Sequence, residues 1–271
     1  MHNLILSANT EVSNIFKWFC CNKLLLNANK TQYVVFRLKG KRIPDNTDAL
    51  TIGGHLITRS QNVRFLGVTV DDHLTWKDHL SNVCTKVSRS VGVISKLRFF
   101  LPKKTLVTLY NALIIPHLTY CNVAWGNTYR SHINKLIVLQ KKAIRIITNS
   151  NYRSPSTPLF LQLQFLPLDE LVSLNCLIFM YKSQSAQNSS FLKDAFIVNS
   201  TVHQYNTRQR NLIHQPLACL ARTQTALNSF VVVCIKEWNK LPQNIRSSPT
   251  LSKFKLSCKK YLFEKLQNML K

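Results

Sequence analysis

Residues 80–97 read LSNVCTKVSRSVGVISKL, and this stretch decides the fold class of most of the chain. Its apolar side chains recur every three or four residues, which places them on one face of an α-helix. Leu101-Pro102 follows shortly afterwards, and a proline there marks the end of such a helix. The stretch therefore predicts one long amphipathic helix. The residues that define its apolar face are Leu80, Val83, Val87, Val91, Ile94 and Leu97.

Helical patterns continue from this stretch towards the C-terminus. The clearest lies at residues 133–148, where Leu136, Leu139, Ala143 and Ile147 recur on one side. Residues 149–158 are rich in Asn, Ser and Pro and are the best candidate for a linker. A polar stretch covers residues 184–211. Further helices are predicted at residues 105–115, about 168–183, 223–238 and 250–269.

The first 70 residues show a mixed pattern instead. Residues 10–20 carry apolar side chains at helical spacing, and Asn9 and Thr10 are candidate caps. Three β-rich runs follow, at residues 33–36, 50–57 and 63–70. Gly53-Gly54 suits the tight turn of a hairpin in the second run. The chain as a whole is therefore predicted to be α+β, with one helix and antiparallel strands followed by a helical remainder.

The composition describes a folded and strongly basic protein. Of 271 residues, 36 are Lys or Arg and 11 are Asp or Glu, which gives a formal net charge of +25. With 45% hydrophobic residues, a disordered, collagen-like or low-complexity chain is excluded. So positive a surface repels itself unless a polyanion binds it. Nucleic acid is the leading candidate partner, and a ribosome-like or membrane-surface partner comes next.

Membrane and secretion signals are weak. Residues 105–129 contain no charged side chain, but polar residues and Pro116 interrupt them, so a buried helical hairpin broken at Pro116 is favoured over a transmembrane span. No signal peptide is visible. Eight cysteines include no Cys-x-x-Cys pair, and most occupy apolar stretches, as reduced core cysteines do. We expect an intracellular protein, in the cytoplasm or nucleus, without a membrane partner.

The clearest binding signal is a long segment without acids. Residues 79–168 hold twelve Lys or Arg and no Asp or Glu. Four of these cations, Lys135, Lys141, Lys142 and Arg145, fall on the polar side of the helix at 133–148. Exposed cations usually alternate with acids on a solvated helix face. We therefore favour a surface that follows nucleic-acid phosphates over an ordinary solvated face.

Asp71-Asp72 directly follows a strand and allows two interpretations. Two aspartates at a strand end are what two-metal phosphoryl transfer uses, but that chemistry needs a further acid from a neighbouring strand. The alternative is a cap, in which one carboxylate accepts backbone N–H groups at the start of the next helix. We favour the cap and predict no metal site in the chain.

Other polar groups are less specific. His203, Tyr205, Arg208 and Arg210 could stack on and bind nucleotides, and a plain loop anchor is an equal alternative. Trp238 is interpreted as a core residue. No Gly-rich phosphate loop, Ser/His/Asp pattern or metal-binding His/Cys cluster is present in the sequence.

Read in order, these pieces resemble the reverse transcriptases of non-LTR (LINE, jockey-like) retrotransposons, in the part that follows the catalytic Tyr-x-Asp-Asp hairpin. The similarity covers about residues 12–265. The residues that carry it are Trp18, Asn22-Lys23-Leu24, Asn27, Lys30-Thr31, Phe36, Phe65-Leu66-Gly67-Val68, Asp71, Leu74-Thr75-Trp76, His79, Tyr110, Pro116-His117-Leu118, Tyr120, Trp125-Gly126, Leu139-Gln140-Lys141-Lys142-Ala143, Arg145, Leu166-Pro167, Tyr205-Asn206-Thr207-Arg208, Ser229-Phe230, Trp238-Asn239, Leu241-Pro242 and Phe254-Lys255.

The resemblance implies a domain order. Residues 1–72 would be a palm remnant with the primer-grip junction, residues 73–150 a helical thumb and residues 151–271 a helical C-terminal region. Within the family's mechanism, Lys30 would lie near the phosphates of the incoming nucleotide, and Phe65-Leu66-Gly67 would grip the primer end. The basic helices would hold the template–primer duplex.

The family's metal-binding aspartates would lie before Met1. We therefore expect a part of an RNA-directed DNA polymerase that binds an RNA or RNA–DNA duplex but is inactive alone. It would hold no cofactor, whereas the full-length family uses Mg²⁺. Met1 could be a true start or an internal Met of a longer polymerase. The alternative is a stand-alone basic nucleic-acid-binding or interaction protein derived from a retrotransposon.

Overall fold

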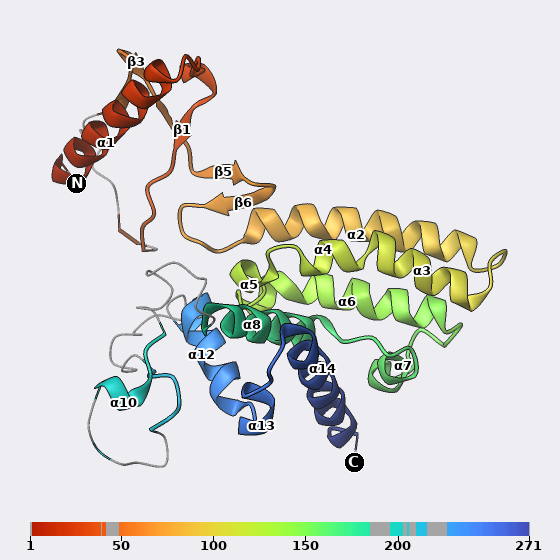
Figure 1. The fold of residues 1–271 in the computed structure, drawn as a ribbon. Coiled ribbons are helices and arrows are strands. Elements are labelled where there is room, and N and C mark those ends of the chain that lie inside the picture. Colours follow the sequence, from red (N-terminus) through yellow and green to blue (C-terminus); the bar gives the residue numbers. More distant parts are fainter. Residues whose placement is uncertain are drawn as a thin grey trace. The chain divides into compact units, whose positions relative to one another are not determined.

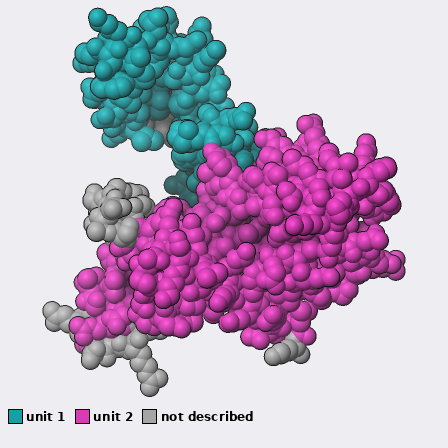
Figure 2. All heavy atoms as spheres, turned by 45° about the vertical axis from the view of Figure 1, so that its right-hand side comes forward, with its two compact units in different colours: residues 1–79 teal, residues 80–271 magenta. Residues whose placement is uncertain are grey.

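The computed structural model describes residues 2–38, 40–41, 49–184, 196–202, 205, 210–215 and 227–270. The chain divides into two compact units, unit 1 (Met1–His79) and unit 2 (Leu80–Lys271), which Figure 2 shows in different colours. The predicted α+β class is confirmed. All the described strands lie in unit 1, and the described part of unit 2 is helical apart from one β-bridge between Val198 and Ile213.

Unit 1 begins with a long helix, α1 (His2–Cys21), which packs on a small apolar core. The helix starts eight residues before the predicted start at residue 10. Asn9 is therefore not a cap. Its side-chain amide instead accepts the N–H of Thr51 at 2.9 Å and donates to the carbonyl of Ala49 at 3.2 Å. The buried residues of the core are Ile5, Leu50, Ile52 and Ile57.

Short strands pair in twos across the rest of unit 1. The parallel pair formed by β1 and β4 differs from the antiparallel pairing that we expected throughout. The predicted strand at residues 63–70 is wrong in detail, because it is a hairpin of two strands, β5 and β6. The elements are the 3₁₀ turn η1 (Ala28–Lys30), β1 (Gln32–Tyr33), β2 (Thr51–Ile52), β3 (His55–Leu56), β4 (Thr58–Arg59), β5 (Asn62–Phe65) and β6 (Val68–Asp71).

The predicted turn at Gly53-Gly54 is confirmed. Ile52 pairs with His55 across it, and both glycines have positive φ, +55° and +82°. Positive φ at both central residues is the two-residue type I′ hairpin turn, which glycine adopts without strain. A side chain at Gly53 would also collide with α1, because its Cβ would lie 2.6 Å from the ring of Phe16.

Unit 2 is a packed group of helices, and most of them agree with the predicted spans. The start of the predicted helix at 223–238 lies outside the described residues, since 216–226 are not described, and its later part is the helix α12, which begins at Phe230. The helices are α2 (Lys77–Leu97, whose first turn belongs to unit 1), α3 (Lys103–Leu113), α4 (Ile115–Thr119), α5 (Asn122–Trp125), α6 (Arg130–Ile147), α7 (Ser156–Gln162), α8 (Leu168–Gln184), α10 (Asn199–Val202), α12 (Phe230–Lys240), α13 (Gln243–Arg246) and α14 (Leu251–Asn268).

Helix α8 lies at the centre of unit 2. It contacts α4, α5, α12 and α14 (Figure 1), so it is surrounded by protein and needs no polar stripe. Gly126, at the end of α5, permits one of these contacts, since an added Cβ would lie 2.4 Å from the side chain of Val172. Glu170 is buried on α8, and Lys265 of α14 pairs with it at 3.1 Å. Burial alone lowers the pKa of Lys265, but the hydrogen bond and charge of Glu170 raise it above its usual range.

The uncharged residues 105–129 fold into α3, α4 and α5 rather than into one hairpin. Pro116 occupies the first turn of α4, where a proline is tolerated because its N–H would have no helical partner. The side chains of Leu106, Tyr110, Ile114 and Leu118 are buried at every fourth position. No helix in the described ranges is long and apolar enough to cross a membrane.

The cysteines differ from the expected core pattern. The seven in the described part of the chain are free thiols, and only Cys176, Cys234 and Cys258 are buried. Burial raises the pKa of Cys258 to about 12, which keeps it protonated. Cys20, Cys21 and Cys121 are exposed and Cys84 is half-buried, because each lies on the outward side of its helix or turn. Apolar surroundings in sequence therefore do not ensure burial.

Candidate nucleic-acid interface

Helix α6 has one apolar side and one basic side. At about 100° per residue, its four candidate cations fall within an arc of about 120°. Lys135 and Lys142 are exposed, while Lys141 and Arg145 are half-buried. The guanidinium of Arg145 donates from Nε to the carbonyl of Ser154 at 2.9 Å, so this side chain also holds the turn that follows the helix. The three lysines are therefore the freer cations of the set.

Cations of neighbouring helices extend this basic surface. Burial raises the pKa of Cys84 on α2, and the positive charge of Lys135 on α6 opposes that rise. Burial also lowers the pKa of His117 on α4, and the charge of Lys86 on α2 lowers it further. The charges of Lys135 on α6 and Lys86 on α2 thus act on side chains of neighbouring helices.

Carboxylates do not neutralise this surface. Arg130 forms a two-pronged ion pair with Asp169, with contacts of 2.6 and 2.9 Å. Within residues 79–168, all of which the structure describes, no other Lys or Arg forms an ion pair with a carboxylate. Eleven of the twelve cations in this segment therefore carry positive charge that a phosphate backbone could neutralise.

Gln140 fixes the orientation of α6. Its side chain is fully buried on the apolar side of the helix. The amide nitrogen donates to the hydroxyl of Tyr110 at 3.0 Å and to the carbonyl of Leu166 at 3.1 Å, and the amide oxygen accepts the N–H of Leu168 at 2.8 Å. One side chain thereby ties α6 to α3 and to the start of α8. Burial raises the pKa of Tyr110, which keeps this hydroxyl protonated.

The candidate primer grip in unit 1 is the turn of the β5–β6 hairpin. Phe65 pairs with Val68, so Leu66 and Gly67 form a two-residue turn with φ of 45° and 83°. Both values are positive, as in the Gly53-Gly54 turn, but here a leucine occupies a left-handed position that L-residues disfavour. Phe65 and Leu66 are 65% and 75% exposed. The turn therefore presents two apolar side chains to solvent on a strained backbone.

Asp71 organises the turn that leads into α2. Its carboxylate accepts backbone N–H groups from His73 at 3.2 Å, Thr75 at 2.9 Å and Trp76 at 2.7 Å. These donors precede the helix, so the carboxylate caps the turn rather than the first turn of the helix as we expected. The left-handed backbone of Leu74 and Trp76 requires this support.

Asp72 is buried and paired with Arg37. Nε and one Nη of the guanidinium lie 3.0 Å from the same carboxylate oxygen, and the backbone N–H of Arg37 also reaches the carbonyl of Asp72 at 2.9 Å. Both aspartates of the pair are therefore engaged in structural contacts. In the described ranges, no group of three or more His, Cys, Asp or Glu side chains is placed to hold a metal ion.

The remaining candidates are scattered. Lys30 is exposed at the end of η1, where the side chain of Asn27 accepts its backbone N–H at 3.1 Å. His203 and Arg208 lie outside the described residues, and Tyr205 is 78% exposed. The structure thus brings together the α6 cations, and it leaves the roles of Lys30 and of the tyrosine–arginine cluster as predictions.

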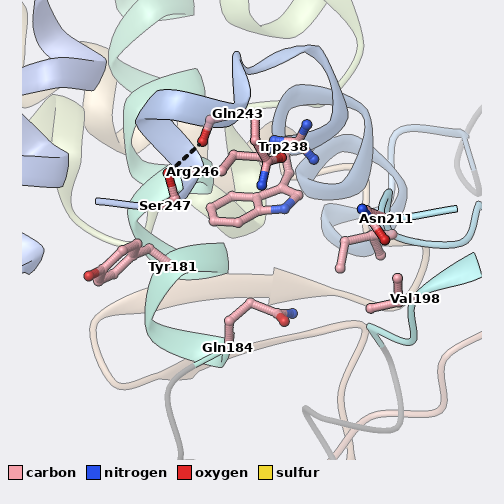
Figure 3. A pocket seen from close by; sticks show the side chains of 9 residues that line it. Tyr181, Gln184, Val198, Asn211, Trp238, Gln243, Arg246 and Ser247 are labelled. Atoms are coloured by element: carbon pink, nitrogen blue, oxygen red, sulfur yellow. Dashed lines mark hydrogen bonds between the residues drawn. The ribbon is translucent and has the colours of Figure 1, made fainter. Parts of the chain in front are cut away.

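A pocket of about 380 Å³ lies at the opposite end of α8 from its Gln140 contact (Figure 3). Figure 3 shows Arg246 beside Trp238 on one side and Gln184 and Val198 on another. Burial lowers the pKa of Arg246, and its Nε is buried without a hydrogen bond in the described part of the chain. The guanidinium could hold an anion there. Trp238 is 7% exposed, consistent with the predicted core role.

Sequence reasoning missed three of these features. Gln140 is a polar residue on an otherwise apolar helix stripe, and that position was a readable signal of a buried polar contact. Arg37 pairs with Asp72 across 35 residues of sequence, and no local pattern reveals such a pair. The turn at Leu66-Gly67 was also missed, because leucine gives no signal for a turn, although Leu66 was among the predicted primer-grip residues.

Comparison with known proteins supplies the family context. The chain is 31% identical over 129 residues to the RNA-directed DNA polymerase from mobile element jockey of Drosophila melanogaster, a match that covers 46% of this chain and 14% of the relative. The expected resemblance is confirmed. The chain is also 28% identical to the probable RNA-directed DNA polymerase from transposon BS of the same species, over 56% of this chain and 17% of the relative.

A further relative is the jockey polymerase of Drosophila funebris, 28% identical over 49% of this chain and 14% of the relative. The matches therefore span only 14–17% of the length of these curated relatives. No family model matches the chain, and no solved structure matches it.

Proposed function

We propose that this chain is the template–primer-holding region of a retrotransposon RNA-directed DNA polymerase, and that it binds an RNA or RNA–DNA duplex through phosphates. The basic surface of α2 and α6 within the acid-free residues 79–168 carries the proposal. The sequence relationship to retrotransposon polymerases supports the choice of nucleic acid over other polyanions. In this assignment α6 lies in a helical thumb, and the Phe65-Leu66-Gly67 turn contacts the primer end.

Salt dependence tests the phosphate contacts. Each phosphate contact releases counterions, so log K falls with log salt with a slope of about −0.9 per contact on duplex DNA. Changing Lys135, Lys141 and Lys142 together to Gln is expected to flatten the slope by roughly three units. Affinity should fall about equally for every sequence, since phosphates carry no base information. Adding Arg145→Gln should flatten it by up to one unit more, with a stability cost from the lost bond to Ser154.

The matched control removes the same charge from another helix. Lys253, Lys259 and Lys260 are exposed on α14, away from α6 in the chain. Their change to Gln is expected to move the slope clearly less. Equal slopes for the two triple variants would mean diffuse attraction to a highly positive chain, and the thumb assignment would then be wrong.

We also propose that the chain alone does not polymerise. The strand-end pair Asp71-Asp72 already accepts backbone N–H groups and an arginine, so it supports structure rather than metal binding. Purified protein should fail to extend a primer on poly(rA) with Mg²⁺ or Mn²⁺, and duplex binding should persist in EDTA at matched ionic strength. Primer extension that persists through purification and disappears in Asp71→Asn would contradict the proposal.

A further inference from the structure

The turn between α2 and α3 exposes two adjacent aromatic rings. Phe99 is 74% exposed and Phe100 is 82% exposed. The turn itself is well ordered by hydrogen bonds, since the N–H groups of Phe100 and Leu101 both reach the carbonyl of Leu97 at 3.0 Å. It lies at the right-hand end of unit 2 in Figure 1. Single exposed apolar residues are ordinary on proteins, but two neighbouring rings on a fixed turn form a patch.

Positive charge surrounds these rings. The guanidinium carbon of Arg98 lies 4.5 Å from the centre of the Phe99 ring, so one ring face already carries a cation. Lys96, Lys103 and Lys104 are exposed on the two helices that meet here. The nearest acids in sequence are Asp78 and Asp169, far outside the turn. The patch therefore combines flat apolar faces with uncompensated cations.

We propose that Phe99 and Phe100 form a stacking platform for unpaired bases of a nucleic acid strand, with Arg98, Lys103 and Lys104 contacting the phosphates that flank those bases. An unpaired strand complements this patch. Its exposed base faces can stack on the two aromatic rings, and its phosphates supply a regular series of negative charges for the surrounding cations. A duplex hides its base faces and fits the lysines of α6 better. The inference rests on the proposed nucleic-acid binding and adds a second, single-strand-specific contact to it.

The turn suits this occupant better than a lipid surface or a second copy of the chain. A second copy would bring the same cations against one another, because this surface has no acids with which to pair them. A lipid surface would accept leucine side chains at these two positions as well as phenylalanine ones. Stacking on bases requires aromatic rings, and this difference decides the experiment.

The experiment compares a blunt RNA–DNA hybrid with the same hybrid extended by an unpaired uridine tail. The intact chain should bind the tailed hybrid more tightly. Phe99→Ala/Phe100→Ala should lower affinity for the tailed hybrid by at least about fivefold, the lower end of what one aromatic–base stack contributes. Its affinity for the blunt hybrid and its salt slope should stay unchanged. A fluorescent base analogue in the tail should lose the quenching that stacking produces.

Two matched variants separate the explanations. Phe99→Leu/Phe100→Leu keeps the apolar surface and should lose the tail preference, whereas Phe99→Trp/Phe100→Trp should keep it. Full retention by the leucine variant, or binding of phosphatidylserine vesicles that the alanine variant loses, would overturn the platform. If the alanine variant binds both hybrids as the intact chain does, the platform is wrong while the α6 surface stands. Failure of the α6 lysine variant to weaken blunt-hybrid binding would instead overturn the proposed function.

Discussion

The two units are held together in different ways. In the described part of unit 1 the buried hydrophobic residues are Ile5, Leu50, Ile52, Ile57 and Val68, whereas the described part of unit 2 buries more than thirty. Unit 1 also leaves large apolar side chains in solvent, including Leu25, Phe65 and Leu66. Its order depends instead on hydrogen bonds such as those of Asn9, Asp71 and Arg37.

This difference predicts different responses to the same kind of change. A packed apolar core penalises cavities and buried polar groups that lose their partners. A unit with little core responds mainly to turns, caps and single polar contacts. The predictions below run from the largest expected effect to the smallest.

The largest effect is expected at the polar centre of unit 2. Gln140→Ala would remove three hydrogen bonds and leave the hydroxyl of Tyr110, the carbonyl of Leu166 and the N–H of Leu168 buried without partners. At about 1–3 kcal/mol per group, partly relieved by relaxation, we expect a loss of about 3–5 kcal/mol in the free energy of unfolding. Denaturant unfolding followed by helical circular dichroism measures it.

The control for this change is Gln267→Ala, which replaces an exposed glutamine on α14 and should cost less than about 0.5 kcal/mol. A loss below about 1 kcal/mol for Gln140→Ala would show that the three partners find water or each other. The tie of α6 to α3 and α8 would then be dispensable.

Hydrogen exchange should separate the units next. Unit 1 opens with few apolar contacts to break, so its amides should exchange through openings of low free energy. We expect amides in residues 24–70 to exchange about a hundredfold faster than structured amides in residues 79–148. Equal slow exchange in both segments would show that unit 1 is as stable as the helices of unit 2. The small core of unit 1 would then not lower its stability, and the prediction would be wrong.

A single carboxylate should have a clear effect in unit 1. Asp71→Asn would place an amide NH₂ where a carboxylate oxygen accepts the N–H of Trp76 or of Thr75, so donors would face donors. We expect a loss of about 2 kcal/mol, seen as faster exchange of the amides of residues 73–76. Asp78→Asn, an exposed change in the first turn of α2, should cost only a few tenths of a kcal/mol.

The sequence predicts the helical unit well, and the physical reason is visible in its residues. Leu80 to Leu97 sets a period of three to four residues, and the observed helix is Lys77–Leu97. The final helix, predicted at 250–269, is Leu251–Asn268. In both helices most of the apolar side chains that set the spacing in the sequence are buried against the rest of unit 2. Burial of this face supplies most of the stability of the helix, so the spacing predicts it well.

Unit 1 was predicted less well, because its decisive contacts are not periodic. The apolar stripe of α1 runs back through Val12 and Ala8 to Ile5, so the early start of this helix was readable, but we predicted it at residue 10. Gly53-Gly54 was readable because glycine favours positive φ. Leu66-Gly67 has the same turn geometry with a leucine, and so the hairpin was interpreted as one strand. Of the candidate site, the cations of α6 and the buried position of Gln140 could be found from sequence, whereas the partners of the Gln140 hydrogen bonds, Tyr110, Leu166 and Leu168, could not.

The smallest effect is expected at this second hairpin, and its sign is the informative part. Leu66→Asn places a residue that tolerates left-handed backbone at the first position of a type I′ turn, where Asn-Gly is the favoured pair. We expect unit 1 to gain about 1 kcal/mol. The same asparagine at Gly53 should destabilise unit 1 instead, because its Cβ would meet the ring of Phe16 at 2.6 Å.

If the exposed Leu66 contacts a primer end, Leu66→Asn should weaken binding of a hybrid with a recessed end while it strengthens the fold. A fold that gains stability with unchanged binding would remove the reason for keeping a strained leucine there, and the primer-grip prediction would be wrong.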